Sequence, residues 1–441
     1  MTAITPKLNA WSVPFPPVAI SVAVPASTEQ ITYEDLYARW ERGNWRAMEI
    51  DFSQDRIDWH ERMTDEQRRG ALWLYTLFFH GEDSVTDNLS PYIDAAPLEE
   101  QKYFLTTQQV DEARHAVFFK RFMEEVVGAG SGSIASVLAS TESLLSWGHR
   151  RLFGRLDEMA DELRKDRSPR KLTEAITLYH IIIEASAAQP GQHMIDTSLE
   201  RLDMMPGFRS GMVNVALDEQ RHIAFGVRLL ADQLKARPEE TQDAIVHTIR
   251  DCLPYATALA WPPNGDRSYT ECLGFSVEDL FEEGARAQES RLRAIGLKID
   301  QIERFPLPLD QSPRQRAERG TKLLEAGFLG EKHGPPRRDP EAIAILFDSA
   351  ARVADARSVA DGTTIQWDFD DADPWYLTLN NGSTSVTQGR ATKPDVTLRM
   401  SFEDFVDLTA KRIEPGRLLL TRRLRPKGKL RLMAKLSAIF G

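Results

Sequence analysis

The sequence predicts a mainly α-helical protein in which a helical bundle is followed by a small α+β domain. Apolar residues recur at helical spacing from Tyr33 to about Leu324. Further along, apolar and polar residues alternate with the period of a β-strand, as in Ile365-Gln-Trp-Asp-Phe369. Between these two patterns, residues 326–340 combine glycines, paired prolines and mixed charge, which is typical of a linker.

These patterns divide the 441 residues into four segments. Residues 1–32 are rich in Pro, Val and Ala without a helical period, so we expect an extended N-terminal arm. The helical domain is expected over residues 33–325, the linker over 326–340, and the α+β domain over 341–441.

Capping and turn signals place the helices of the first domain. Thr64-Asp-Glu-Gln67 is a capping box, and it opens a helix that runs to about Leu89. Ser90-Pro91 and Ala96-Pro97 end this helix, and a second helix follows from Leu98 to about Val127. Further helices are expected over residues 136–164, 170–189, 208–235 and 237–260.

The α+β domain is expected to contain strands joined by at least one tight turn. Asn380-Asn-Gly382 predicts a hairpin between two short strands. The expected strands cover residues 365–369, 375–379, 383–386 and 396–400. Helices over residues 402–413 and about 427–440 complete the domain.

Composition excludes several classes of protein. No run of eighteen apolar residues occurs, so a membrane span is not expected. The first twenty residues lack a basic region followed by an apolar core, so we expect no secretory signal. The two cysteines, Cys252 and Cys272, are too few for a disulfide framework. A reducing cytoplasm is therefore expected.

Charge is distributed unevenly along the chain. Residues 411–441 carry ten Lys/Arg against Glu414, a net charge of +9, which leaves −20 for the remainder. A basic end on an acidic body predicts contact with an anionic partner, such as a membrane surface or the phosphates of coenzyme A. A solvated helix face explains the charges equally well. Nucleic acid is not expected, because leucines interleave with these charges as in a packed element.

Two segments carry nearly the same motif: Asp111-Glu-Ala-Arg-His115 and Asp218-Glu-Gln-Arg-His222. Glu and His three positions apart lie on one face of a helix, so one metal ion can take a ligand from each. A single Glu-x-x-His is a weak signal in a chain with nine His. Its duplication, with the same Asp and Arg, is a specific one.

A two-metal site in a helical bundle also needs one Glu from each of two other helices. Glu82 precedes Glu112, and Glu184 precedes Glu219, at similar distances along the chain. Four buried carboxylates are costly without cations, whereas two divalent metal ions neutralise them when both histidines are neutral. The predicted metal ligands are Glu82, Glu112, His115, Glu184, Glu219 and His222.

The two aspartates are expected to support the histidines. Metal-bound His usually donates its other ring N–H to a carboxylate. We expect Asp111 and Asp218 each to accept this bond from the histidine of the opposite helix. Arg114 and Arg221 could be further partners of these groups or plain exposed arginines, and exposure is slightly favoured.

At these residues the sequence resembles the ribonucleotide reductase small-subunit superfamily, particularly its ligand-binding oxidases. The likeness covers roughly residues 33–230 and includes Leu36-Tyr-Ala-Arg-Trp40 and Glu49-Ile-Asp-Phe-Ser53. The resemblance implies a ferritin-like fold and the six metal ligands given above. It also implies that Trp45 and Asp218 connect to a metal-bound histidine, and that the protein forms a homodimer.

The sequence departs from this family in informative places. Radical-generating reductase subunits carry a tyrosine one turn past the first motif histidine, where this chain has Phe119. A role as a reductase partner is therefore not expected, also because the chain ends in a folded domain. Tyr179 matches the tyrosine that ligand-binding oxidases cross-link to a valine, whose position here is Ser84, next to Val85.

The C-terminal domain resembles the sterol carrier protein type 2 family over roughly residues 340–436. The resemblance rests on Ile365-x-Trp-x-Phe369, Trp375-Tyr-Leu377, Pro394-Asp-Val-Thr-Leu398 and Ser401-x-x-Asp-Phe405. It implies an apolar tunnel for a lipid or acyl-CoA and no catalytic groups.

We therefore expect an O2-activating oxidase or monooxygenase that acts on a hydrophobic, lipid or acyl-type substrate and requires an electron donor. The cofactor is two iron ions or one manganese and one iron, since the ligand set suits both. Tyr179 is a candidate catalytic residue. The expected apolar walls are Leu77, Phe78, Phe118, Phe119 and Ile183.

Two other functions remain open. One is N-oxygenation of an amine, although the order Glu219-x-x-His222 argues mildly against it. The other is a non-enzymatic protein that binds metal or lipid. Metal storage is disfavoured because a fused C-terminal domain would obstruct a cage of identical subunits.

Overall fold

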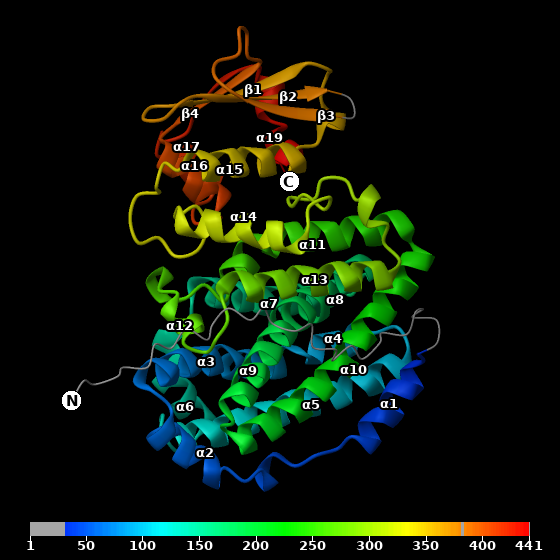
Figure 1. Cartoon of the computed structure of the whole chain (residues 1–441). Helices are drawn as coiled ribbons and strands as arrows, with labels where there is room; N and C mark the ends of the chain where they lie inside the picture. Colours follow the sequence, from blue (N-terminus) through cyan, green and yellow to red (C-terminus); the bar gives the residue numbers. More distant parts are fainter. Residues whose placement is uncertain (1–30, 381–382, 441) are drawn as a thin grey trace, which may run out of the picture.

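The computed structural model describes residues 31–380 and 383–440, and Figure 1 shows two stacked lobes. The larger lobe is helical and the smaller lobe is a sheet with helices on one face. Of the expected N-terminal arm, only Ile31 and Thr32 lie within the described residues. No helix of the described part is long and apolar enough to cross a membrane.

The larger lobe consists of short and long helices. Its α-helices are α1 (Tyr33–Arg42), α2 (Ser53–Ile57), α3 (Asp65–Asn88), α4 (Ser90–Ala95), α5 (Glu99–Phe122), α6 (Ile134–Thr141), α7 (Trp147–Lys165), α8 (Pro169–Ile176), α9 (Gln189–Leu202), α10 (Pro206–Ala236), α11 (Pro238–Ala258), α12 (Ser268–Glu271), α13 (Val277–Ile295) and α14 (Pro313–Glu325). Three wider helices with i→i+5 bonds are η3 (Asp58–Arg62), η4 (Met123–Val127) and η6 (Thr177–Ala188). Single 3₁₀ turns cover Ala47–Glu49, Glu142–Leu144, Pro263–Gly265, Ile299–Gln301 and, in the smaller lobe, Ala356–Ser358.

Four helices form the centre of this lobe: α3, α5, η6 and α10. Helix α3 packs along α5, to which α4 connects it, and η6 packs along α10. The lower side is covered by α1 and α2, and the upper side by α7, α11 and α13 (Figure 1). The apolar faces of these helices make two buried clusters, on either side of the central polar residues.

Several expected boundaries of the larger lobe are confirmed. The Thr64 side chain accepts a hydrogen bond from the Gln67 N–H, and the Gln67 side chain accepts one from the Thr64 N–H, so the capping box is formed. The second helix and its wide last turn end at Gly128, which takes a left-handed φ of 75°. The expected helix 208–235 corresponds to α10 and the helix 237–260 to α11.

Two expected boundaries are wrong. The segment 136–164 is not one helix, because Ser146 begins a new one: its Oγ accepts from the His149 N–H and donates to the Leu259 carbonyl, 2.6 Å away. The segment 170–189 does not stop at Pro190. Proline needs no N–H partner at the start of a helix, so η6 continues into α9 with Pro190 in its first turn.

The smaller lobe is a five-stranded sheet of order β3-β2-β1-β4-β5. Its strands are β1 (Thr363–Phe369), β2 (Trp375–Asn380), β3 (Ser383–Gln388), β4 (Val396–Met400) and β5 (Arg425–Gly428). β1 pairs in parallel with β4, and all other neighbours are antiparallel. Helices cover the face toward the larger lobe (Figure 1): α15 (Pro340–Val353), α16 (Phe402–Thr409), α17 (Pro415–Leu420), α18 (Leu430–Met433) and α19 (Leu436–Phe440).

The end of the chain differs from the expectation of one helix over 427–440. Pro426 and Gly428 are poor helix formers, and this segment instead pairs with β4 as the edge strand β5. The expected turn at Asn380-Asn-Gly382 has its last two residues outside the described ones, and the flanking strands β2 and β3 pair as a hairpin requires.

Ion pairs join the two lobes. Arg319 on α14 reaches Asp348 on α15 at 2.6 Å, and Lys411 of the smaller lobe pairs with Asp251 on α11. The Arg412 guanidinium donates to the carbonyls of Gly327 and Gly330. The smaller lobe therefore stands against the α11 and α14 side of the bundle.

Candidate metal centre

Six side chains from four helices meet in the middle of the larger lobe. They are Glu82 on α3, Glu112 and His115 on α5, Glu184 on η6, and Glu219 and His222 on α10. Each is buried, and none is more than 6% exposed. The structure thus brings together all six residues that the sequence predicts as metal ligands.

One half of the cluster surrounds His115. Its Nδ1 lies 3.2 Å from Glu82 Oε2, 3.4 Å from Glu112 Oε2 and 3.7 Å from Glu219 Oε1. One potential ligand atom from each of these four residues lies within 4.8 Å of the others, a spacing that suits a single metal ion.

The other half surrounds His222. Its Nδ1 lies 3.1 Å from Glu112 Oε1, 3.4 Å from Glu184 Oε1 and 3.7 Å from Glu219 Oε2. Glu112, Glu184 and His222 form a second group within the same 4.8 Å limit. Glu112 and Glu219 each present one oxygen to either histidine, so they stand between two adjacent sites.

The electrostatics of this cluster fit cations. Burial raises the pKa of Glu82 and Glu184 well above the usual carboxyl value, and repulsion from Glu219 raises that of Glu184 further. Glu184 Oε2, Glu219 Oε2 and His222 Nδ1 are buried without a well-aligned hydrogen bond among the described residues. Buried, unpaired carboxylate oxygens facing imidazole nitrogens are the donor set that divalent metal ions satisfy.

Each aspartate supports the histidine of the other helix, as expected. His115 Nε2 lies 3.1 Å from Asp218 Oδ2, and His222 Nε2 lies 3.1 Å from Asp111 Oδ2. With Nε2–H donated to the aspartate, the lone pair of each Nδ1 points into the cluster. Burial opposes ionisation of Asp218, but the His115 bond and nearby charges hold its pKa below the usual range.

Two tryptophans continue this arrangement. The Trp45 indole N–H donates to Asp218 Oδ2 at 2.8 Å, as the resemblance implies. The Trp40 N–H donates to Asp111 Oδ1 at 2.9 Å. The role of Trp40 was not predicted. The two equivalent motifs could have suggested it, because each motif aspartate accepts a hydrogen bond from one of the two nearby tryptophans.

The expected exposure of the motif arginines is wrong. The side chains of Arg114 and Arg221 are only 11% and 9% exposed. Each guanidinium contacts both Asp111 and Asp218, with Arg114 reaching Asp218 at 2.8 Å and Arg221 reaching Asp111 at 3.0 Å. Two buried aspartates need two cations, and the i,i+3 spacing of each motif places an arginine beside its own aspartate.

Tyr179 lies against the cluster because η6 is a wide helix. Residues five apart lie one above the other where bonds run from i to i+5, so Tyr179 and Glu184 share a face. The Tyr179 hydroxyl donates to Glu112 Oε1 at 2.7 Å, and burial raises its pKa well above the usual phenol value. A neutral phenol therefore faces the centre.

Glu184 has a further support that was not predicted. The Gln108 side-chain amide donates to Glu184 Oε1 at 2.8 Å, and Gln108 Oε1 lies 3.1 Å from His180 Nε2. Gln108 and His180 are fully buried. Because Gln108 bonds to Oε1, Oε2 is the Glu184 oxygen that has no hydrogen bond among the described residues. Isolated Gln and His residues give no signal in the sequence, so only the fold reveals them.

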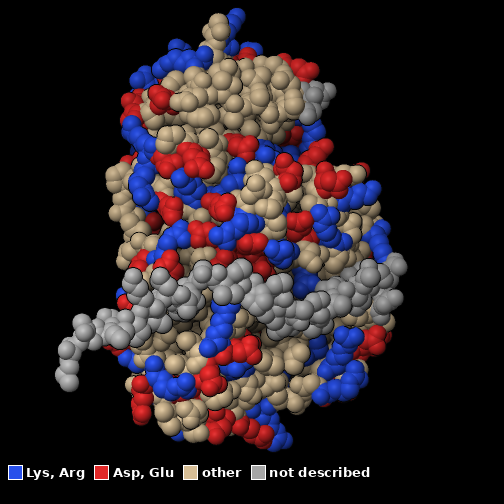
Figure 2. All heavy atoms as spheres, in the orientation of Figure 1, with Lys and Arg blue, Asp and Glu red and all other residues tan. Residues whose placement is uncertain are grey.

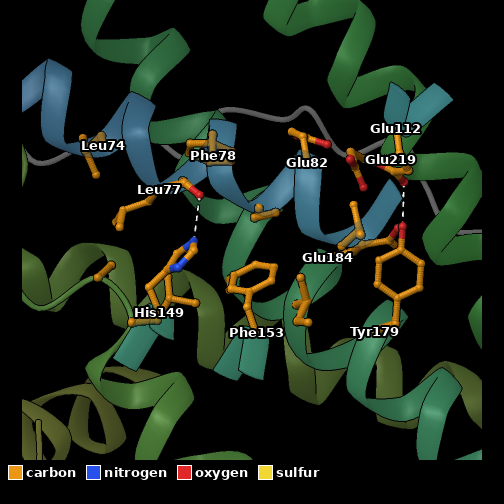
Figure 3. A pocket seen from close by; sticks show the side chains of 18 of the residues that line it. Leu74, Leu77, Phe78, Glu82, Glu112, His149, Phe153, Tyr179, Glu184 and Glu219 are labelled. Atoms are coloured by element: carbon orange, nitrogen blue, oxygen red, sulfur yellow. Dashed lines mark hydrogen bonds between the residues drawn. The ribbon is translucent and has the colours of Figure 1, made fainter. Parts of the chain in front are cut away.

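An apolar cavity of about 70 Å³ extends from the cluster. Glu82, Glu112, Glu184 and Glu219 gather at one end, and Leu74, Leu77 and His149 lie at the other (Figure 3). His149 bonds to the Leu77 carbonyl, and burial lowers its pKa to about 3, so it stays neutral. The remaining wall is mostly apolar and includes Phe78, Val85, Phe153, Ile183, Ala187, Ala188, Leu259 and Leu280.

The expected cavity walls are correct in part. Leu77, Phe78 and Ile183 line the cavity. Phe119 instead stacks on Phe78 with ring centroids 6.0 Å apart, and Phe118 packs in the apolar core below. Of the pair considered for a tyrosine cross-link, Val85 lines the cavity beside Tyr179, because it lies one helical turn after Glu82, and Ser84 does not.

Comparison with models of known protein families shows which family this chain belongs to. Residues 26–259, more than half of the chain, match the family model described as ribonucleotide reductase, small chain. The chain belongs to the ribonucleotide reductase small-chain family. Residues 345–441 match the family model described as the SCP-2 sterol transfer family. Both resemblances seen in the sequence are thereby confirmed.

Solved structures agree with membership of the ribonucleotide reductase small-chain family. An R2-like ligand-binding oxidase from Sulfolobus acidocaldarius is 24% identical, with a TM-score of 0.52, over 67% of this chain and 97% of that chain. A variant of an R2-like ligand-binding oxidase with an anaerobically reconstituted Mn/Fe cofactor is 26% identical, with a TM-score of 0.52, over 60% of this chain and 94% of that chain. The first likeness shows the shared fold.

Proposed function

We propose that this protein is a di-metal oxidase or monooxygenase that activates O2 and acts on a hydrophobic, lipid or acyl-type substrate. His115, Glu82 and Glu112 would hold one metal ion, and His222 and Glu184 the other. Glu219 and Glu112 would contribute to both. The observation that carries the proposal is the buried cluster of four carboxylates and two imidazoles with unpaired ligand atoms.

The metals are proposed to be two irons or one manganese and one iron. Carboxylate and imidazole ligands suit both metals. The R2-like ligand-binding oxidase to which this chain is 26% identical carries a Mn/Fe cofactor, which supports the mixed pair. When bound, such a pair supplies the electrons that reduce O2 and is restored by an external electron donor.

The residues of this chain would fix the geometry of that chemistry. Asp111 and Asp218 hold the tautomer and direction of the two imidazoles. The phenol of Tyr179 stands at the cavity wall and donates a hydrogen bond to Glu112, which would hold this carboxylate in place. The apolar wall keeps bulk water away from the reacting groups.

Oxidation of a bound substrate fits this member of the family better than radical supply to a reductase. The position one turn past His115 holds Phe119, which is fully buried between Phe78 and Phe118 and cannot form a tyrosyl radical. The cavity also gives the cluster an apolar chamber of its own. A substrate with an alkyl or acyl chain matches its walls.

Oxygen uptake tests the proposed function. Adding ferrous iron to the metal-free protein should consume O2, and Glu184→Ala should abolish the uptake because it removes a carboxylate that faces His222. Replacing the exposed Asp87 on the neighbouring helix α3 by alanine is the control and should leave uptake intact. Full uptake in Glu184→Ala would exclude this centre as its source.

Binding of a fatty acid tests the substrate class. Ala187 lines the cavity, and Ala187→Leu adds three carbons inside it. A displacement of about two methylenes of ligand should weaken binding of a long-chain fatty acid roughly tenfold, while metal content stays the same. Titration calorimetry measures both proteins, with Ala113→Leu on the exposed side of α5 as the control. Equal affinity in Ala187→Leu would place the fatty acid elsewhere.

An amine N-oxygenase is the alternative enzyme and a metal- or lipid-binding protein the non-enzymatic one. Away from the four glutamates the described cavity wall is mostly apolar, which suits an alkyl or acyl chain better than a charged amine. We also propose that the C-terminal lobe carries a lipid, which its match to the SCP-2 sterol transfer family supports, and that the protein is a homodimer.

A further inference from the structure

The end of α17 forms an apolar projection on the smaller lobe. Leu418 is fully buried, whereas Leu419 and Leu420 are 46% and 88% exposed. Leu420 is the most exposed large apolar side chain among the described residues. The turn is closed by the Arg422 N–H bonded to the Leu419 carbonyl at 3.1 Å. We call residues 417–422 the α17 tip.

Basic residues lie within this tip and follow it along the chain. Arg417, Arg422, Lys427 and Arg431 are exposed and make no ion pair with a described residue. The other basic side chains here are neutralised, as with Arg423 on Asp404 and Lys429 on Asp395 at 2.5 Å. Glu414 is the one acidic residue of segment 411–441.

The tip lies beside the open edge of the sheet. The α17 segment leads directly into β5, whose partner is β4 on one side and which ends the strand order on the other. Figure 2 shows Lys and Arg, with some Asp and Glu among them, on the side of the upper lobe where Figure 1 places α17 and β4. The projection therefore combines exposed leucines with unpaired positive charge.

We propose that the α17 tip docks the smaller lobe onto an anionic phospholipid surface. Leu419 and Leu420 would enter the boundary between headgroups and acyl chains, and Arg417 and Arg422 would contact the lipid phosphates. Apolar insertion and electrostatic attraction are each weak, and stable attachment to a membrane uses two such signals together.

Other occupants explain the two features less well. A nucleic acid or a free coenzyme would pair with the arginines but would leave an 88% exposed leucine in water. A bilayer satisfies the charges and the leucines at once. The inference goes beyond the metal centre, and it places the protein at the phase in which apolar substrates dissolve.

Vesicle sedimentation of the full-length protein tests the proposal. The protein should bind vesicles of phosphatidylcholine with about a third phosphatidylglycerol, bind neutral phosphatidylcholine far less, and release as salt rises. Leu420→Asp should weaken binding at least about tenfold, because it removes an apolar contact and adds a repelled charge. Arg417→Glu should weaken it by roughly 25-fold, since each unit charge near the surface contributes about fivefold and the reversal changes two.

Met48→Asp provides the matched control, because Met48 is 69% exposed on the larger lobe. It should bind vesicles like the parent protein. Metal content and oxygen uptake should be unchanged in Leu420→Asp, so the docking surface and the oxidase function fail independently. Full vesicle binding by Leu420→Asp, or equal binding to neutral and anionic vesicles, would overturn the proposal. So would a finding that the protein is a dimer without lipid and that Leu420→Asp dissociates it, because the tip would then be a dimer contact.

Discussion

Replacing Glu112 with alanine should reduce the metal content from about two ions per chain to nearly none. The two oxygens of Glu112 face the two histidines, at 3.4 Å from His115 Nδ1 and 3.1 Å from His222 Nδ1. Its loss therefore removes a ligand from both sites. Elemental analysis after aerobic expression with iron and manganese measures the effect.

Substitution of Glu82 gives the internal comparison. Glu82 faces His115 and belongs to only one of the two groups of ligand atoms. Glu82→Ala should therefore keep about one ion per chain, held by the group around His222. Glu99→Ala, at the exposed start of the helix that carries Glu112, should keep both. An unchanged metal content in Glu112→Ala would contradict the ligand assignment.

Replacing Asp218 with leucine should lower the stability of the metal-free protein by about 3–5 kcal/mol. Asp218 accepts hydrogen bonds from His115 and Trp45 and pairs with Arg114 and Arg221. The substitution leaves these buried donors without their acceptor. Thermal unfolding of the metal-free protein measures the loss separately from any effect on metal binding.

The two aspartates should also be coupled. Asp111 and Asp218 share both arginines, so Asp111→Leu combined with Asp218→Leu should cost clearly less than the sum of the single losses or clearly more, but not equal it. Asp87→Leu, on the exposed face of α3, is the control and should change stability little. A stable Asp218→Leu variant would show that the ring of charges contributes nothing to folding.

The duplicated motif made the ligands predictable from the sequence. Glu-x-x-His fixes two ligands on one helix face whatever the rest of the chain does, and two copies with a preceding Glu each define a whole centre. The support of His115 by Asp218 of the opposite helix was also expected from the motifs, because metal-bound histidines usually donate their other N–H to a carboxylate.

Features that depend on the exact rotation of a helix were not predictable. An arginine in a polar motif looks the same in sequence whether it is exposed or, like Arg114, buried against an aspartate. Phe78 and Phe119 are both apolar residues on central helices, yet only Phe78 reaches the cavity. In the wide helix η6 Tyr179 faces Glu112, and no periodicity in the sequence predicts the i→i+5 bonds of this helix.

The smaller lobe also contains elements that the sequence predicts and one strand that it does not. The alternation of Ile365, Trp367 and Phe369 predicts β1, because its inward residues form the core of the lobe. The strand β5 was missed because its four residues are all exposed, so burial imposes no pattern on them. Its place is set by backbone pairing with β4 at the sheet edge.

Anomalous scattering from a crystal, measured at the iron and manganese edges, would test the two-metal centre most directly. It should show two adjacent peaks, one bounded by Glu82, Glu112 and His115 and the other by Glu112, Glu184 and His222. A single peak, or none in protein expressed with both metals, would contradict the proposed centre.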